Sequence, residues 1–180
     1  SNFSQLLMRL FVYRAAAHVG AVFLWFFAMA RIPLADVTAM NYLSPIYVTL
    51  GAALFLGEKL ALRRGIAGGI ALVGAFIILR PGIRSVDMGH LAMLLAAVFF
   101  ACSYLLTKRI SDQVSAGAIV VMLSLFVTLG LAPMAWMVWV PPSTNDLLIL
   151  FGVACFATLG HYTMTLAFAA APVNITQPVT

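Results

Sequence analysis

The sequence predicts an all-α fold, a polytopic transmembrane helical bundle. Hydrophobic residues make up 64% of the 180 residues and charged residues only 8%, and the mean hydropathy is +1.09. A soluble domain carries about 25% charged residues, so this chain has too little charge to cover a water-facing surface. The apolar residues also form long runs without polar helix faces, which argues against a soluble all-helical protein.

One uncharged stretch, residues 37–57, has the length of a membrane crossing. As a helix it would be about 31 Å long, and the hydrocarbon core of a bilayer is about 30 Å thick. Four charged residues follow at once: Glu58, Lys59, Arg63 and Arg64. Because a Lys or Arg at the bilayer centre costs about 2.5–3.5 kcal/mol, this charged segment must lie at a membrane surface. The next apolar run completes a helical hairpin.

The same reasoning divides the whole chain into six crossings and the start of a seventh. The predicted crossings are residues 10–30, 33–57, 64–80, 90–107, 116–140 and 147–170, and the seventh begins after Pro172. Pro33 suits the first position of a helix, where a missing N–H does no harm. In the third crossing Gly65, Gly68, Gly69 and Gly74 form a small-residue stripe, which predicts close packing against another helix.

The basic residues predict the orientation. One side of the predicted topology holds seven of them: Arg9, Arg14, Lys59, Arg63, Arg64, Lys108 and Arg109. The other side holds three: Arg31, Arg80 and Arg84. By the positive-inside rule the first side is cytoplasmic, so we expect a multi-pass protein of the inner (plasma) membrane. The net charge of +5 is therefore interpreted as topology, and no nucleic-acid partner is expected.

The chain also contains a faint internal repeat. Residues 28–34 resemble residues 167–173, and both segments join a helix end, a proline turn and the start of a new helix. Five predicted crossings lie between them, which places the two copies on opposite faces of the membrane. Inverted repeats of this kind are common in secondary transporters, whose substrate sites lie near the bilayer midplane between the halves.

Several motifs together resemble the EamA family of the drug/metabolite transporter superfamily. They are Arg14, the segment Ile32-Pro33-Leu34-Ala35-Asp36-Val37-Thr38-Ala39, Ser44-Pro45, Gly57-Glu58, Arg63-Arg64, Leu79-Arg80-Pro81-Gly82, Leu166-Ala167-Phe168, Ala171-Pro172-Val173 and Gln177-Pro178. The resemblance implies ten helices in two inverted five-helix repeats, with helices three to eight visible here. Residues 1–84 would then belong to the first repeat and residues 85–180 to the second.

The function that this resemblance implies is alternating-access transport of small metabolites or drugs, either export or import. The expected partners are the lipid bilayer and a small-molecule substrate, and a homodimer remains open. The competing interpretation is a membrane-embedded enzyme or a non-transporting subunit. All five acidic residues lie at or beyond predicted helix ends, and no histidine has metal-ligand spacing with another histidine or a cysteine. We therefore expect no catalysis, metal or cofactor.

Candidate substrate-cavity residues gather on the first two crossings. They are Trp25 on the first, and Asn41, Tyr42, Ser44 and Pro45 on the second. Spacings of three and four place Asn41, Ser44 and Pro45 on one helix face. Because polar side chains are expensive in lipid, that face should point into protein or a wet cavity. Ordinary hydrogen bonding between helices is the alternative. Pro45 should also free a carbonyl and bend the helix.

Tyr104 and His161 are the candidates in the second half. Tyr104 could reach a cavity or anchor its helix at the membrane interface. His161 and His18 are the titratable groups near neutral pH that lie within the apolar depth. Either they couple transport to protons, or they are neutral histidines bonded to a neighbouring helix.

Glu58, Arg63 and Arg64 are candidate residues of a cytoplasmic gate, where an ion pair could close the entrance to the cavity. The alternative is a solvated loop.

Overall fold

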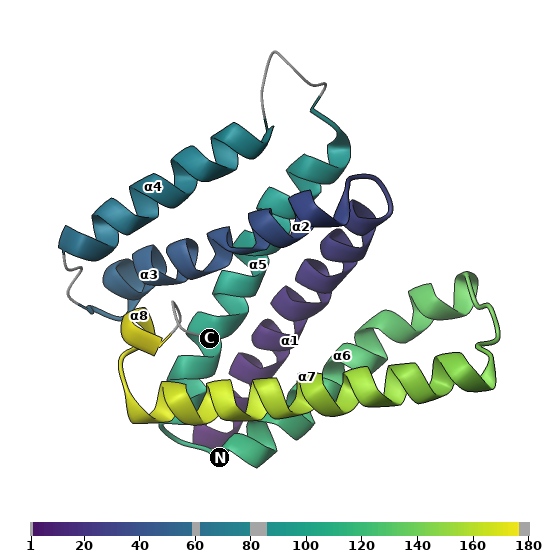
Figure 1. The fold of residues 1–180 in the computed structure, drawn as a ribbon. Helices are drawn as coiled ribbons and strands as arrows, with labels where there is room; N and C mark the ends of the chain where they lie inside the picture. Colours follow the sequence, from purple (N-terminus) through teal and green to yellow (C-terminus); the bar gives the residue numbers. More distant parts are fainter. Residues whose placement is uncertain (1, 59–61, 80–85, 177–180) are drawn as a thin grey trace.

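The computed structural model describes residues 2–58, 62–79 and 86–176, and all regular structure in these ranges is helical (Figure 1). The elements are α1 (Asn2–Met29), α2 (Leu34–Asn41), α3 (Leu43–Phe55), α4 (Leu62–Leu79), α5 (Met88–Ser111), α6 (Ala116–Met137), α7 (Thr144–Ala170) and α8 (Val173–Thr176). The predicted all-α helical bundle is confirmed.

α1 and α5 form the centre of the bundle and run in opposite directions (Figure 1). Small residues allow their close approach, because Ala21 and Ala28 on α1 and Ala96 and Ala97 on α5 are fully buried. α6 lies against α1, and α2 and α3 lie against α5. α4 packs on the outer side of α2 and α3.

Four described helices are long and apolar enough to cross a membrane: α1, α5, α6 and α7. They correspond to the first, fourth, fifth and sixth predicted crossings. The third crossing is α4, whose apolar part is Gly65–Ile77; its predicted end at Arg80 lies outside the described residues. The second crossing is not one helix, since α2 ends at Asn41 and α3 begins at Leu43.

Pro45 explains this interruption. A proline inside a helix lacks the N–H that would bond the carbonyl four residues earlier, and its ring collides with that carbonyl. For Pro45 the affected carbonyl belongs to Asn41, the last residue of α2. The carbonyl oxygen of Pro45 itself accepts the Thr49 hydroxyl at 2.8 Å. The predicted bend at Pro45 is therefore present as a break at Tyr42.

The predicted glycine stripe of α4 is wrong for three of its four members. A Cβ built at Gly65, Gly69 or Gly74 would meet nothing within 4 Å, whereas one at Gly68 would lie 3.3 Å from Ile46 Cγ2. α4 is a peripheral helix, so most of its surface has no described neighbour. Close helix approach occurs instead at Gly130 of α6, where a Cβ would lie 2.7 Å from Val19 Cγ2.

α7 is the least embedded of the long helices, because none of its most apolar 18-residue window is buried. Ser143 caps its start and exchanges hydrogen bonds with Asp146, whose backbone N–H lies 3.2 Å from Ser143 Oγ. Only the C-terminal part of α7 reaches the bundle, where Thr165 and Phe168 are buried. This part contains His161 and faces α5 and α6 (Figure 1).

Candidate functional site

A buried polar cluster begins on α1. Arg14 and His18 are four residues apart and therefore share one helix face, and Arg14 is only 1% exposed. Its Nη1 donates a hydrogen bond of 2.9 Å to the carbonyl oxygen of Ile119 on α6. His18, on the same face, contacts Ser103 of α5 and His161 of α7. Four helices thus meet around one cation.

His18 connects α1 with α5 and α7. Its Nδ1 lies 3.3 Å from the hydroxyl oxygen of Ser103, itself buried. Its ring makes an edge contact with the ring of His161, with centroids 5.4 Å apart. The structure therefore brings together two histidines that are 143 positions apart in the chain.

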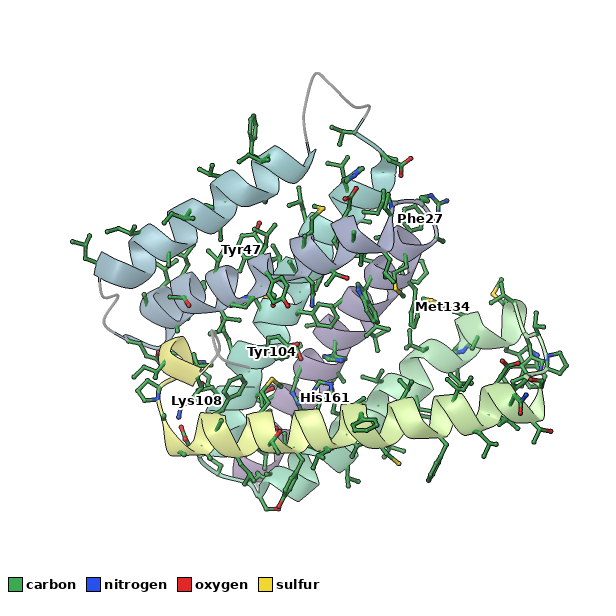
Figure 2. All side chains as sticks on the ribbon, in the orientation of Figure 1. Phe27, Tyr47, Tyr104, Lys108, Met134 and His161 are labelled. Atoms are coloured by element: carbon green, nitrogen blue, oxygen red, sulfur yellow. The ribbon has the colours of Figure 1, made fainter. Side chains whose placement is uncertain are left out.

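Aromatic rings form one wall of this cluster. Phe100 lies 5.4 Å from His18 and 6.2 Å from Tyr104, measured between ring centroids. Tyr104 in turn makes an edge contact with Phe168 of α7 at 6.4 Å. Figure 2 shows Tyr104 and His161 pointing into the space between α5, α1 and α7. We call Arg14, His18, Phe100, Ser103, Tyr104, His161 and Phe168 the Arg14 cluster.

Two polar atoms of the Arg14 cluster are buried without a hydrogen-bond partner: Nε of Arg14 and Nδ1 of His161. The five acidic side chains, all within the described ranges, lie elsewhere at helix ends. Asp36 lies 3.6 Å from His90, Glu58 accepts from Val173, Asp87 accepts from Gly89, Asp112 contacts Lys108 and Asp146 accepts from Ser143. The cluster is therefore cationic, and it has hydrogen-bonding capacity to spare.

Of the predicted cavity residues, Tyr104 and His161 belong to the Arg14 cluster. Trp25 does not, because it lies almost two turns further along α1 from His18. There it is half-buried against the hydrophobic cluster that contains Ala28 and Met40, and its ring is 5.4 Å from that of Phe26.

The predicted common face of Asn41, Ser44 and Pro45 is wrong. Asn41 and Tyr42 are exposed, Ser44 is 3% exposed, and Pro45 is half-buried. The spacing argument assumed one continuous helix, and the break at Tyr42 removes that condition. Ser44 Oγ is buried without a hydrogen-bond partner. Among Asn41, Tyr42, Ser44 and Pro45, Ser44 is therefore the one residue with an unpaired polar atom inside the described bundle.

Glu58 does bridge the two halves of the chain, by a contact that the sequence did not reveal. Two residues after the end of α3, Gly57 has a φ of 69°, in the left-handed region that glycine tolerates. This reversal directs Glu58 toward the proline turn after α7, where its Oε1 accepts the Val173 N–H at 2.9 Å. The side chains of Arg63 and Arg64 lie outside the described part, so their role as gate residues stays a prediction.

Two basic residues at the end of α5 reinforce this bridge. Lys108 donates to the Phe168 carbonyl oxygen of α7 at 2.6 Å, and Arg109 donates to the Phe55 carbonyl oxygen of α3 at 3.2 Å. Helix C-termini carry partial negative charge, which these cations offset. We call Glu58, Lys108 and Arg109 the end clasp, because their hydrogen bonds join the ends of α3, α5 and α7 to the start of α8.

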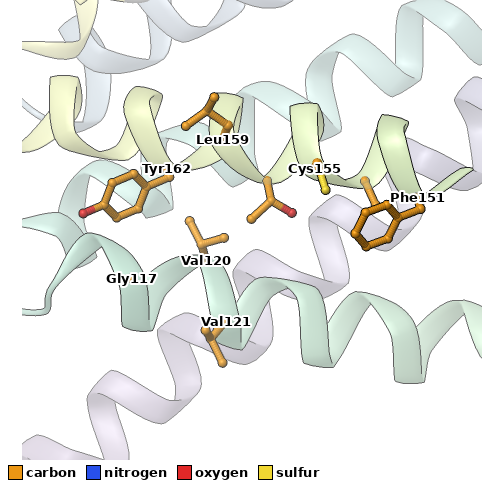
Figure 3. Close-up of a pocket in the computed structure, with 9 residues that line it drawn as sticks. Gly117, Val120, Val121, Phe151, Cys155, Leu159 and Tyr162 are labelled. Atoms are coloured by element: carbon orange, nitrogen blue, oxygen red, sulfur yellow. The ribbon is translucent and has the colours of Figure 1, made fainter. Parts of the chain in front are cut away.

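A groove of about 610 Å³ separates α6 from α7. Phe151, Cys155, Leu159 and Tyr162 of α7 line it together with Val120 and Val121 of α6 (Figure 3). Its walls are almost entirely apolar, so it lacks the polar groups that orient a polar solute. Its floor approaches the Arg14 cluster, since Val120 follows Ile119 and Tyr162 follows His161.

Sequence reasoning missed Arg14, Ser103, Lys108 and Arg109 as site residues. Lys108 and Arg109 were counted only as topology signals, and Arg14 as a topology signal and a family motif. The spacing of four between Arg14 and His18 was a usable signal, because it places a cation and a titratable ring on one face of an apolar helix.

Long apolar helices that bury a polar cluster between them define a multi-pass integral membrane protein. Within that class, the chain belongs to the EamA-like transporter family, whose model matches residues 1–80.

Relatives agree with this assignment. The chain is 31% identical over 157 residues to a riboflavin transporter of Vibrio cholerae, covering 86% of this chain and 53% of the relative. It is 31% identical over 155 residues to the pseudopaline exporter CntI of Pseudomonas aeruginosa, covering 84% and 55%. It is 20% identical over 154 residues to an S-adenosylmethionine uptake transporter of Rickettsia prowazekii, covering 86% and 52%. The chain thus spans about half the length of these curated relatives. No solved structure matches it.

Proposed function

We propose that this chain forms the central part of a secondary transporter that moves small organic solutes across the inner membrane by alternating access. The observation that carries the proposal is the Arg14 cluster. Polar and ionisable groups inside a membrane protein are expensive and mark solute pathways, and this cluster joins α1 of the first half to α5, α6 and α7 of the second. Residues 1–84 and 85–180 would supply parts of two inverted repeats.

The basic residues support a cytoplasmic location for the end clasp. Arg14 is buried within the protein, so it should be removed from the count of surface charges. Six basic residues then remain on that side against three on the other, and the positive-inside bias persists.

In this proposal the end clasp is the cytoplasmic gate. Its contacts hold the proline turn between α7 and α8 against the ends of α3 and α5. α7 is otherwise weakly embedded, so withdrawal of its C-terminal part would separate His161 from His18 and admit a solute. Release of the clasp would open the Arg14 cluster to the cytoplasm.

The first test is transport by the full-length protein in proteoliposomes. Riboflavin and S-adenosylmethionine are the first solutes to try, because relatives are named for them. We expect labelled solute to exchange against unlabelled solute trapped inside. Absence of exchange for these and for a broad metabolite panel would contradict the proposed function.

The second test is gating, measured with Ser103→Cys in a background whose native cysteines are replaced by alanine. Ser103 is 1% exposed, so an impermeant thiol reagent on the cytoplasmic side should label it slowly. Glu58→Ala removes a hydrogen bond to a charged group, worth about 1.5–3 kcal/mol, and labelling should accelerate on the order of tenfold. Gln5→Ala, an exposed change on α1, is the control. Equal labelling in both variants would remove Glu58 from the gate.

A further inference from the structure

We infer that the Arg14 cluster binds the acid group of a planar aromatic acid, which makes small organic anions with an aromatic ring the substrate class of this protein. The inference rests on the proposed function and concerns the same site. Its starting point is that the cluster has a buried cation but no acidic partner among the described residues.

The charge of Arg14 provides the first argument. A guanidinium is protonated at all physiological pH values, and a buried charge costs several kcal/mol unless it is paired. Here Arg14 is 1% exposed, and the hydrogen bond of its Nη1 goes to the neutral carbonyl of Ile119. The acidic side chains are occupied at helix ends. A ligand that carried its own negative charge would remove this imbalance.

The spare donors provide the second argument. Because Nη1 of Arg14 is bound to Ile119, the Nε side of the planar fork is available, and Nε is buried without a partner. A carboxylate or phosphate matches this fork, since its two oxygens can accept parallel N–H bonds. His161 adds Nδ1, also buried and unpartnered. It lies beside His18, which is on the same face of α1 as Arg14.

The rings provide the third argument, which concerns the body of the ligand. Phe100, Tyr104 and Phe168 form a continuous series of ring contacts beside the two histidines. Aromatic rings prefer offset-stacked or edge contacts with other rings. An acid group at Arg14 would therefore place a planar ring against this wall once α7 moves away.

The rival explanation is that Arg14 has only a structural role and holds α1 against α6 through its hydrogen bond to Ile119.

The experiment compares matched acid and neutral probes on the full-length protein. The pairs are indole-3-acetate with its amide, nicotinate with nicotinamide, and flavin mononucleotide with riboflavin. Binding is measured by competition and ligand-induced thermal stabilisation, and transport is measured in proteoliposomes. We expect the acid to be preferred in at least one pair. Arg14→Gln should weaken binding of that acid about 30-fold or more, because truncating one member of a buried charge pair costs about 2 kcal/mol or more, and should leave the neutral partner nearly unchanged.

Arg9→Gln is the matched control, since it removes the same charge from an exposed position on the same helix. Arg14→Lys keeps the charge without the planar fork, so its loss of acid binding should lie between that of the unchanged protein and that of Arg14→Gln. If Arg14→Gln does not fold, His161→Leu removes the second donor and should reduce the preference for the acid several-fold.

Each outcome decides the inference. Equal binding and transport of the acid and neutral probes would overturn the inference. A preference for the acid that persists in Arg14→Gln would also overturn it. If Arg14→Gln does not fold, the same holds for a preference that persists in His161→Leu. Failure to bind any acid in the panel also overturns it. In each of these cases, exchange of a neutral solute would leave the proposed transport function standing. Absence of exchange for every solute would instead remove the proposed function itself.

Discussion

Arg9 and Arg14 lie five residues apart on α1, yet one is exposed and the other is 1% exposed. In the sequence both mark the end of an apolar run and count equally toward topology. The difference arises because the side of α1 that carries Arg14 and His18 meets α5, α6 and α7. Burial turns a residue that marks a membrane surface into the centre of a candidate site.

His161 supplies a prediction at this scale, which tests the proton coupling that the sequence suggested. Its ring contacts His18 of α1, which shares a helix face with Arg14. Tyr104 is the titratable member of the cluster on α5, Tyr162 adjoins His161 on α7, and α6 carries no titratable residue. Protonation of His161 would add positive charge beside Arg14, so anion binding should strengthen as the pH falls. His161→Gln should flatten that profile at normal expression. An unchanged profile in the variant would make His161 a structural residue.

Gly89 and Gly69 give a matched pair of stability predictions. A Cβ at Gly89 would lie 2.8 Å from Ile32 Cγ2 and 3.1 Å from Arg31 Cβ, so Gly89→Ala should destabilise the protein by about 1–3 kcal/mol. A Cβ at Gly69 meets nothing within 4 Å, so Gly69→Ala should be neutral or slightly stabilising. Thermal unfolding in detergent measures both. A larger loss for Gly69→Ala would contradict the packing described for α4.

At the scale of elements, two prolines within apolar segments have different consequences. Pro45 coincides with the break between α2 and α3, whereas α6 continues through Pro133. The two sites also differ in surroundings, because Pro133 is exposed while Pro45 is half-buried beside buried Ser44.

Pro45→Ala should join α2 and α3 into one helix, because residue 45 regains the N–H that bonds the Asn41 carbonyl. We expect the apparent melting temperature to rise by a few degrees, corresponding to about 1 kcal/mol, while the transport rate falls. Pro133→Ala is the control and should leave transport unchanged. If Pro45→Ala transports normally, the break between α2 and α3 serves packing alone.

At the scale of the whole molecule, orientation rests on the distribution of basic residues, and it can be tested at two exposed turns. Cys102 and Cys155, both exposed, are first replaced by alanine. Gln113→Cys lies between α5 and α6, and Asn145→Cys lies at the start of α7.

An impermeant thiol reagent added to cells with a permeabilised outer membrane should label Asn145→Cys and spare Gln113→Cys, because the α5–α6 turn is on the side rich in basic residues. Both positions should react fully after the inner membrane is disrupted. The reverse pattern in intact cells would invert the orientation and move the end clasp to the outer face.

The four long apolar helices, their places in the chain and the family resemblance were accessible from the sequence. These features depend on properties that each residue has by itself, namely the cost of burying charge and the fit between run length and bilayer thickness. The bend at Pro45 was predictable for the same reason, since a missing N–H acts locally. Tyr104 and His161 were recognised because polar groups in apolar runs stand out.

The tertiary structure alone decided which of these groups meet. The pairing of His18 with His161, the burial of Arg14 against Ile119 and the capture of the Val173 N–H by Glu58 all join distant parts of the chain. Such contacts depend on how each helix rotates and crosses its neighbours, and the apolar runs here are hydrophobic on all sides, so no stripe in the sequence specifies that rotation. The glycine stripe of α4 was wrong for this physical reason, whereas the common face expected for Asn41 and Ser44 was wrong because the helix is interrupted at Tyr42.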